Sequence, residues 1–557
     1  MGFITNKKLF IFLIFSFAGL LQAQTNYYKF AITFNDKENN PFSIQQADAF
    51  LSERAIARRE RMNISITSHD LPVTPLYVNQ VLQADTSVRL FYTSKWLNAV
   101  VVGTTDSSLT QNWANLSFVK NIRCIYVGKV PNKVPFQKAS QLPFTAQFDS
   151  TKYGVAENQI RMLSLDYLHT KGFFGQGKVV AVFDAGFTNV FQISAFQHLY
   201  QDERLLGTWD FVGAQENVYF GSSHGTQVLS CMAAVIDKLY IGTAPAASYY
   251  LFRTEDGSSE TISEEYNWVA AAEKADSAGV DVINSSLGYT VFDNPLDNHT
   301  YQQLDGKTTI ITKGANWAAG KGILVVNSAG NSGNNSWKYI GAPADADSVL
   351  SIAAVDSVRV YAPFSSQGPR VDGAIKPNVA AKGALANIIG VGGATSVSNG
   401  TSFSAPILAG AATALWSKHP NKSNMEIFKS IEQSAHLYEN PNHYLGYGIP
   451  NFGMADKILS QVNLDNYYKK QQILIYPNPV QDQLFYVDYY SDTNETIRLH
   501  IHDLKGRQIH TQELNVLAKT VITIPVQLST QLAAGVYIVS ILPSKTAKKF
   551  KAKFIAK

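Results

Sequence analysis

The feature that most constrains the fold is residues 399–416, where a Gly-Thr pair precedes Ser402 and a run of small and apolar residues follows. This pattern predicts a tight turn leading into a buried helix. Pro406 is compatible with such a helix in its first turn, where the backbone N–H groups have no intrahelical partner. The turn would place the Ser402 hydroxyl at a helix N-terminus, where free amides stabilise negative charge. Ser402 is therefore either a helix N-cap or a nucleophile.

Three further segments have the composition of buried strands: residues 178–184, 279–287 and 323–333. Continuous apolar runs suit parallel strands that are covered on both faces. Active residues of open α/β sheets lie at the carboxyl ends of such strands, and Asp184 holds this position. A lone Asp after a strand is also a common turn former. The alternation of strands and helices predicts an α/β domain with a mostly parallel sheet and helices on both faces.

Two other residues are candidates for a catalytic site. His224 begins a predicted buried helix, although a His in that position is more often structural. Asn331 lies in the turn Ala-Gly-Asn-Ser-Gly, and such a sequence often makes only a turn. With Asp184 and Ser402, the four candidates occur in the chain order Asp, His, Asn, Ser.

These segments together resemble the subtilisin-like serine peptidases, or subtilases. Gly-Thr-Ser-Phe-Ser-Ala-Pro around Ser402 resembles the nucleophile motif, and the residues from His224 resemble the histidine motif. The order Asp, His, Ser is that of the subtilisins. The resemblance covers about residues 151–460. It implies that Ser402 attacks the scissile carbonyl and that His224 is the base. It also implies that Asp184 orients the imidazole and that Asn331 donates to the oxyanion.

Two segments resemble the subtilase residues that line the substrate cleft, where the backbone pairs with an extended peptide. The corresponding residues are Ser286, Leu287, Gly288, Ser328, Ala329 and Gly330. A plain strand end is the alternative for the first segment. The chain departs from the family at Ala185, Gln227 and Ser230, where Ser or Thr, His and Gly are usual. We expect activity to be retained, because the main task of the carboxylate is to orient the imidazole.

Composition restricts the cofactors and partners. The implied mechanism requires no cofactor. A structural calcium ion is compatible with the many Asp and Asn residues, but the sequence shows no ligand set, and any metal site is unassigned. The net charge of +4 and the lack of a basic patch with interleaved aromatic residues before residue 540 argue against a nucleic-acid partner. Cys124 and Cys231 are too few for a disulfide framework, and both are expected to be buried.

Residues 1–23 have the pattern of a signal peptide. Lys7 and Lys8 precede the apolar run 9–21, which is short for a membrane span. No later stretch is long and apolar enough to cross a bilayer, so no transmembrane span is expected in the mature chain. We therefore expect the protein to leave the cytoplasm.

Residues 24–150 form a predicted small α+β unit followed by a linker from residue 131. The expected order is strand, helix, strand, strand, helix, strand, as in ferredoxin-like folds. The expected strands are residues 28–34, 88–92, 98–103 and 122–127, and the expected helices are residues 47–61 and 107–114. Alone, this unit could be any small binding domain. In front of a peptidase domain it resembles a subtilase propeptide, which is a partner that the chain itself carries.

Residues 473–557 form a predicted all-β sandwich, because short strands alternate with turns. Residues 476–479, 503–506, 535–537 and the basic end 548–557 resemble the C-terminal sorting domain of type IX secretion substrates. An adhesive or stabilising β-domain with a solvated basic tail is the alternative. The resemblance implies export through the periplasm of a Gram-negative bacterium, to the medium or the cell surface, by the type IX machinery.

The sequence thus predicts a self-processed, secreted serine endopeptidase that acts on proteins or peptides, with its peptidase domain at residues 151–462. The alternative is a surface binding protein that kept this fold without the chemistry. The intact set of four candidate residues argues against that alternative.

Overall fold

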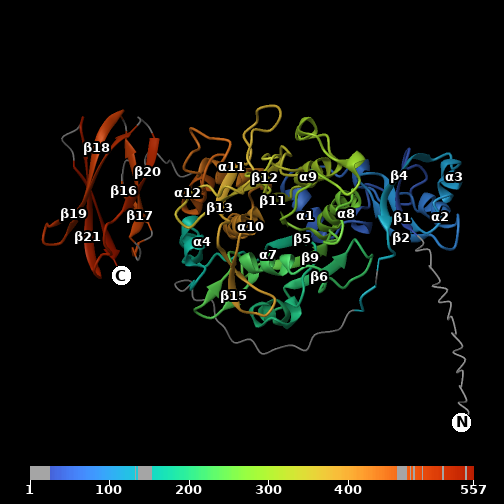
Figure 1. Cartoon of the computed structure of the whole chain (residues 1–557), viewed down its shortest axis with the longest axis horizontal. Helices are drawn as coiled ribbons and strands as arrows, with labels where there is room; N and C mark the ends of the chain where they lie inside the picture. The colour runs from blue at the N-terminus through green and yellow to red at the C-terminus, as the bar shows by residue number, and fades with distance from the viewer. Residues whose placement is uncertain are drawn as a thin grey trace, which may run out of the picture.

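The computed structural model describes residues 26–131, 133–135, 153–460, 473–476, 478–480, 483–491, 493–516, 520–545 and 549–556. Three parts follow one another along its longest axis (Figure 1). The N-terminal unit, in blue, lies at one end, the C-terminal unit, in red, lies at the other, and the large central domain separates them. The predicted signal peptide and residues 136–149 of the predicted linker lie outside the described residues.

The central domain is built on a seven-stranded sheet in the order β13-β12-β11-β10-β5-β9-β6, in which every neighbouring pair is parallel. The strands are β5 (Val179–Asp184), β6 (Leu205–Asp210), β9 (Ser248–Arg253), β10 (Val282–Ser285), β11 (Leu324–Ser328), β12 (Val349–Val355) and β13 (Val379–Lys382). All residues of β5 and of β10 to β13 are buried, as expected for strands covered on both faces.

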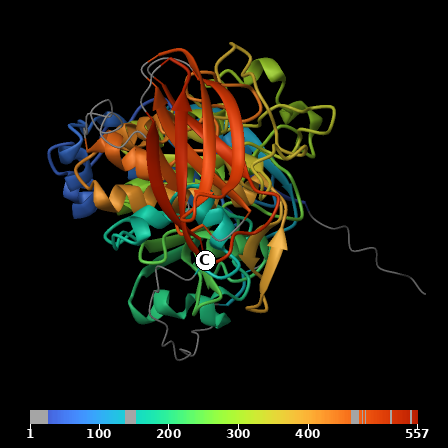
Figure 2. The same ribbon diagram turned by 90° about the vertical axis from the view of Figure 1, so that its left-hand side faces the viewer.

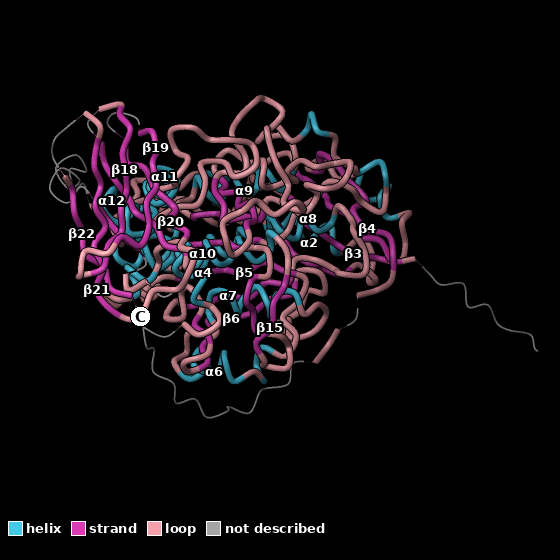
Figure 3. Tube along the Cα trace, turned by 60° about the vertical axis from the view of Figure 1, so that its left-hand side comes forward, coloured by secondary structure: helices cyan, strands magenta, loops and turns pink. Residues whose placement is uncertain are grey.

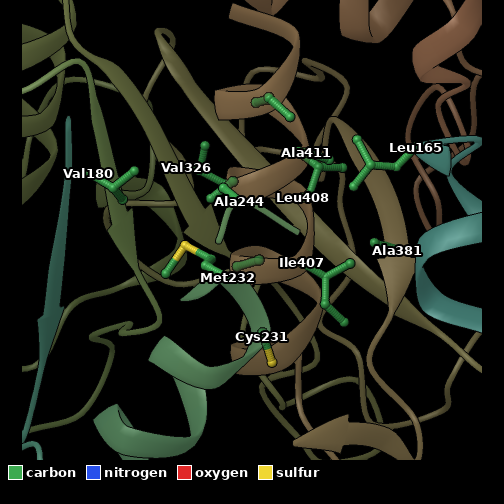
Figure 4. Close-up of a cluster of buried hydrophobic side chains, with 14 of the residues drawn as sticks. Leu165, Val180, Cys231, Met232, Ala244, Val326, Ala381, Ile407, Leu408 and Ala411 are labelled. Atoms are coloured by element: carbon green, nitrogen blue, oxygen red, sulfur yellow. The ribbon is translucent and has the colours of Figure 1, made fainter. Parts of the chain in front are cut away.

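Helices cover both faces of this sheet (Figure 3). Val180 and Val182 of β5 share one core with α7 (His224–Ala233) and α10 (Thr401–Lys418). Figure 4 shows part of that core, with Val180 and Val326 of the sheet near Met232 of α7 and Leu408 of α10. The alternate residues of β5 share a second core with α8 (Ser263–Ala278) and α9 (Ile310–Gly320). The predicted α/β architecture is therefore confirmed.

The remaining elements of the central domain are short. Its other helices are α4 (Glu157–Met162), α5 (Asp166–His169), α6 (Gln197–Gln201), α11 (Asn424–Gln433) and α12 (Phe452–Leu459). Two small hairpin pairs complete it, β7 (Val235–Ile236) with β8 (Tyr240–Ile241) and β14 (Ala386–Ile389) with β15 (Thr395–Ser398).

The N-terminal unit has an antiparallel sheet in the order β2-β3-β1-β4, which is the order of a ferredoxin-like fold. Its strands are β1 (Tyr27–Phe34), β2 (Arg89–Ser94), β3 (Ala99–Thr104) and β4 (Val119–Gly128). The helices that share a core with this sheet are α2 (Pro75–Leu82) and α3 (Leu109–Ala114). Sequence analysis missed α2.

The single helix expected at residues 47–61 is wrong. A short 3-10 turn (Ala47–Ala49) precedes the helix α1 (Glu53–Arg61), because the Ser52 hydroxyl accepts a hydrogen bond from Ala55 N at 3.2 Å and caps α1 there. Helix α1 does not cover the N-terminal sheet. It contacts α8 of the central domain instead (Figure 1).

The C-terminal unit is a sandwich of two antiparallel sheets, β16-β17-β20 and β19-β18-β21-β22, as predicted (Figure 2). The strands are β16 (Ile473–Tyr476), β17 (Leu484–Ser491), β18 (Glu495–Asp503), β19 (Gln508–Val516), β20 (Thr520–Gln527), β21 (Gly535–Pro543) and β22 (Phe550–Ala556). Residues of both sheets, among them Phe485, Ile497 and Val539, share one core.

Two further expectations concern burial. Cys231 is buried as expected, but Cys124 is exposed, because β4 is an edge strand that pairs only with β1. Among the helices in the described part of the chain, none combines the length and the apolarity that crossing a bilayer requires.

Candidate active site

Asp184 and His224 meet at the carboxyl edge of the central sheet. Asp184 is the last residue of β5 and is fully buried, and His224 is the first residue of α7. The His224 Nδ1 atom lies 2.9 Å from Oδ2 and 3.0 Å from Oδ1 of Asp184. Gly225 permits this approach, because a Cβ atom there would lie 2.3 Å from the Gly186 carbonyl oxygen.

The carboxylate is held although Ala185 supplies no hydroxyl. The Ala185 backbone N–H donates to Asp184 Oδ1 at 2.8 Å. Burial alone would lower the pKa of His224, but the charge and the hydrogen bond of Asp184 outweigh it and raise that pKa to about 9. The pair therefore favours the protonated imidazole, which is the form that a general base generates when it takes a proton.

Ser402 is the second residue of α10 and is 7% exposed. Its hydroxyl donates to the Ser286 carbonyl at 3.4 Å rather than to the imidazole. The ring of the next residue, Phe403, lies 5.8 Å from the His224 ring, centroid to centroid. Ser402 and His224 thus come from neighbouring helix N-termini, and a rotation of the Ser402 side chain is needed for a direct hydrogen bond. Hydrogen bonds of catalytic groups often tighten only in the substrate complex.

Pro406 does not lie in the first turn of α10, so that expectation is wrong. The helix begins at Thr401, and Pro406 is its sixth residue. Proline has no N–H to donate to the carbonyl four residues earlier, which is that of Ser402. The Ser286 hydroxyl donates to this carbonyl at 2.9 Å and replaces the missing helical hydrogen bond.

Asn331 is exposed and follows β11, and its side chain is fixed through its oxygen. Asn331 Oδ1 accepts from the Thr401 backbone N–H at 2.9 Å and from Thr401 Oγ1 at 3.0 Å. Thr401 Oγ1 in turn accepts from Gly330 N at 3.1 Å. Because both donors bind the oxygen, the amide nitrogen of Asn331 remains available to donate elsewhere.

The six predicted substrate-lining residues fall into two adjacent segments. Ser286, Leu287, Ser328 and Ala329 are buried, Gly330 is half-buried, and Gly288 is exposed. The side-chain amide of Asn327 donates to the carbonyls of Leu287 (2.9 Å) and Ser328 (2.8 Å), and so ties the two segments together.

Sequence reasoning missed Thr401, Asn327 and Glu255. Glu255 follows β9, and its carboxylate accepts from the Tyr289 hydroxyl at 2.8 Å. Burial and the nearby charge of Asp184 raise the pKa of Glu255 to about 8. No motif could have indicated it, because Glu255 approaches Asp184 only through the pairing of β9 with β5. Thr401 did lie inside the quoted Gly-Thr-Ser string, and its hydroxyl was the available signal.

No set of three or more His, Cys, Asp or Glu side chains is arranged to hold a metal ion within the described ranges. These described residues therefore add no ligands for the structural calcium ion considered from the sequence.

Comparisons with protein families match all three parts of the chain. The model of the subtilase family (peptidase S8) matches residues 175–448. The peptidase S8 propeptide domain of Bacteroidota matches residues 29–141, and the secretion system C-terminal sorting domain matches residues 474–557.

Two individual relatives match over about half of the chain. Subtilisin E of Bacillus subtilis (strain 168) is 32% identical over 310 residues, which cover 55% of this chain and 71% of subtilisin E. Subtilisin of Bacillus pumilus is also 32% identical over 310 residues, covering 55% of this chain and 98% of that protein. The crystal structure of MycP1 without its propeptide has a TM-score of 0.44 at 21% identity, and the match covers 54% of this chain and 96% of that chain.

Proposed function

Since the chain belongs to the subtilase family, we propose that Asp184, His224 and Ser402 are its catalytic triad and that Asn331 stabilises the oxyanion. The coarser function follows from the family: the chain is a serine-type endopeptidase with a propeptide domain and a C-terminal sorting domain.

The single observation that carries the proposal is the contact between Asp184 and His224 at 2.9 Å. In the proposed reaction the Ser402 hydroxyl turns from the Ser286 carbonyl to His224 Nε2, which takes its proton during attack on the scissile carbonyl. His224 then returns the proton to the leaving amine. Asp184 holds Nδ1 and stabilises the imidazolium that forms in between.

The oxyanion needs donors in a fixed orientation. Asn331 can supply its amide nitrogen, because Thr401 fixes the opposite side of the same amide. Ser402 lies in the first turn of α10, where backbone N–H groups have no helical acceptor, so its own N–H is the natural second donor. No step of this mechanism requires a cofactor.

A serine-directed fluorophosphonate probe tests the assignment directly. The full chain should be labelled at Ser402, whereas Ser402→Ala should neither be labelled nor cleave casein. Ser404→Ala is the matched control, because that serine lies in the same helix and donates to the Thr401 carbonyl. A Ser402→Ala protein that cleaves casein at the normal rate would overturn the assignment. If the full chain is folded but is neither labelled nor active, the result would support the alternative function, a surface binding protein that kept the fold without the chemistry.

We further propose that the N-terminal unit is removed by self-cleavage. The segment after β4 lies along the central domain: Gln215 Oε1 accepts from Val134 N at 2.8 Å, and Asn217 donates to the Val134 carbonyl at 3.2 Å. The mature chain should start between about residues 139 and 159. N-terminal sequencing of the processed full chain and of Ser402→Ala decides this. Processing of Ser402→Ala at the same position and rate would exclude self-cleavage.

The sorting domain indicates a secreted or cell-surface protein. We propose that the type IX machinery carries it out of the periplasm of a Gram-negative bacterium.

A further inference from the structure

Helix α1 of the N-terminal unit is unusual because its arginines contact another domain. Arg58 and Arg59 are each 1% exposed, although an arginine is rarely buried without partners. Both lie against the end of α8, where Ala278 is the last helical residue. One face of the N-terminal sheet is covered by α2 and α3, and side chains of its other face share a core with α8 and α9. Helix α1 adds a separate, charged contact with the end of α8.

Arg58 satisfies the carboxyl ends of two helices at once. Its guanidinium donates to the carbonyls of Asp276 in α8 (3.1 Å) and of Lys321 directly after α9 (3.1 Å), and to that of Val280. The last carbonyls of a helix have no helical donor, and the helix dipole places negative charge there. One fixed planar cation with five N–H groups suits such a set of acceptors better than an ammonium group does.

The buried carboxylate of Asp276 completes the surface that receives α1, which is formed by the carboxyl ends of α8 and α9 and is called the receptor here. Asp276 is fully buried and accepts from Arg58 at 2.6 Å, from Arg59 at 2.8 Å and 2.9 Å, and from Lys95 at 3.1 Å. These three cations belong to the N-terminal unit. They hold the pKa of Asp276 below its usual value despite burial, which by itself would raise it.

The surface around Asp276 is shaped for close approach. A Cβ atom at Gly279 would lie 2.7 Å from the Cβ of Arg54, and one at Gly322 would lie 2.7 Å from the sulfur of Met62. Both glycines follow the ends of helices, α8 and α9, and have positive φ angles. Glycine is therefore needed twice here, for the backbone turn and for contact with α1.

The receptor lies far from the proposed triad. Asp281, two residues after Gly279, pairs with the start of β5, because its carboxylate accepts from Val179 N at 2.9 Å. Asp184 is at the other end of the same strand, roughly 16 Å away at about 3.3 Å per residue. Cleavage of the linker at Ser402 would thus leave these contacts untouched.

We propose that the carboxyl ends of α8 and α9, with Asp276, form a guanidinium-binding site that retains the propeptide through Arg58 and Arg59 of α1 after the linker is cut. The proposal rests on the removal of the N-terminal unit described above. It adds which residues of α1, α8 and α9 hold the cut propeptide in this chain. Removing Arg58 would take one hydrogen bond from the buried Asp276 carboxylate and one from each of three carbonyls, those of Asp276, Val280 and Lys321.

The test uses the full chain with Ser402→Ala and a recognition site for an unrelated peptidase placed among residues 136–152. After the linker is cut by that peptidase, size-exclusion chromatography on serial dilution gives the dissociation constant of the fragment. Arg58→Gln should raise this constant on the order of 100-fold. Asp276→Asn should also raise the dissociation constant.

Arg61→Gln is the matched control, because Arg61 lies in the same helix but is exposed. It should change the dissociation constant by less than about threefold. Equal dissociation constants for Arg58→Gln and Arg61→Gln would overturn the proposal. If Arg58→Gln does not fold, Arg58→Lys replaces it: it keeps the charge without the planar fork, and should weaken binding about tenfold. Equal dissociation constants for the Arg58→Lys and Arg61→Gln fragments would also overturn the proposed guanidinium-binding site.

The design separates this proposal from self-cleavage. Ser402→Ala cannot cut its own linker in the proposed mechanism, so the dissociation constant does not depend on that reaction. A wild-type chain that never processes itself would contradict self-cleavage alone.

Discussion

The Ser286 hydroxyl donates a hydrogen bond of 2.9 Å to the carbonyl of Ser402, the proposed nucleophile. Pro406 creates the need for this bond, because it cannot donate to the same carbonyl from within the helix. A residue predicted to line the substrate cleft therefore also fixes the backbone that carries the nucleophile. In return, the Ser402 hydroxyl donates to the Ser286 carbonyl at 3.4 Å.

We expect Ser286→Ala to lower kcat more than it changes KM. The substitution leaves the buried Ser402 carbonyl without a donor, which costs about 1–3 kcal/mol. Because this shifts the backbone that carries the Ser402 hydroxyl, we expect kcat to fall roughly tenfold. Steady-state kinetics on a peptide substrate measure kcat and KM for this variant. Ser430→Ala is the control, because that buried serine donates to the Ile427 carbonyl within α11. Equal kcat values for the two variants would contradict a positioning role.

Asn331→Leu should reduce kcat by about 10²–10³, the loss found when one oxyanion donor was removed from subtilisin, a relative of this chain. Thr401→Val should cost less, because Asn331 Oδ1 keeps the hydrogen bond from the Thr401 N–H when the one from Oγ1 is lost. Single-turnover kinetics separate these effects from product release. An Asn331→Leu protein as active as wild type would remove Asn331 from the mechanism.

The pH profile should reflect the pair of Asp184 and His224. A free imidazole titrates near 6.5, whereas Asp184 overcomes the effect of burial and raises the pKa of His224 to about 9. The base must be neutral, so kcat/KM should rise with pH until about pH 9. Glu255 contributes to the raised pKa of His224, so Glu255→Gln should move the midpoint to lower pH. A wild-type midpoint of 6–7 would contradict the raised pKa.

The same pair links stability to pH. A folded-state pKa above the unfolded value means that the contribution to stability is fully present below about pH 6.5 and is lost as pH rises through about 9. The Tm of Ser402→Ala, which avoids self-digestion, should exceed that of Ser402→Ala with Asp184→Asn at pH 6. This difference should shrink by pH 10. A difference that grows with pH would have the wrong sign.

Deletion of residues 473–557 should leave an active peptidase that no longer reaches the outside of the cell. The C-terminal sandwich has its own core, so its loss exposes little of the central domain. Cell fractionation should find the truncated enzyme in the periplasm. A deletion of residues 26–131 that still exports the chain would show that the sorting information lies in the tail. Normal yield of the truncated enzyme in the medium would contradict the sorting role.

The sequence was most informative where local pattern and tertiary structure agree. The strand expected at residues 178–184 is β5 (Val179–Asp184), since its continuous apolar run matches a strand that is buried on both faces. It failed at residues 47–61, where a polar helix with four arginines shows no apolar stripe to indicate what it covers. It also failed for Pro406, because the first residue of a helix depends on how the preceding turn is held.

By itself, the sequence determined the fold class and the order of the three parts, because these depend on residue types and periodicities along one segment at a time. The candidates Asp184, His224, Asn331 and Ser402 came from the resemblance of several segments taken together. Only the tertiary structure placed Glu255 near Asp184, the Ser286 hydroxyl on the Ser402 carbonyl, and Arg58 on the ends of two helices. The physical reason is that each of these contacts joins groups more than 70 residues apart. Strand order and helix packing set such distances, and no local pattern encodes them.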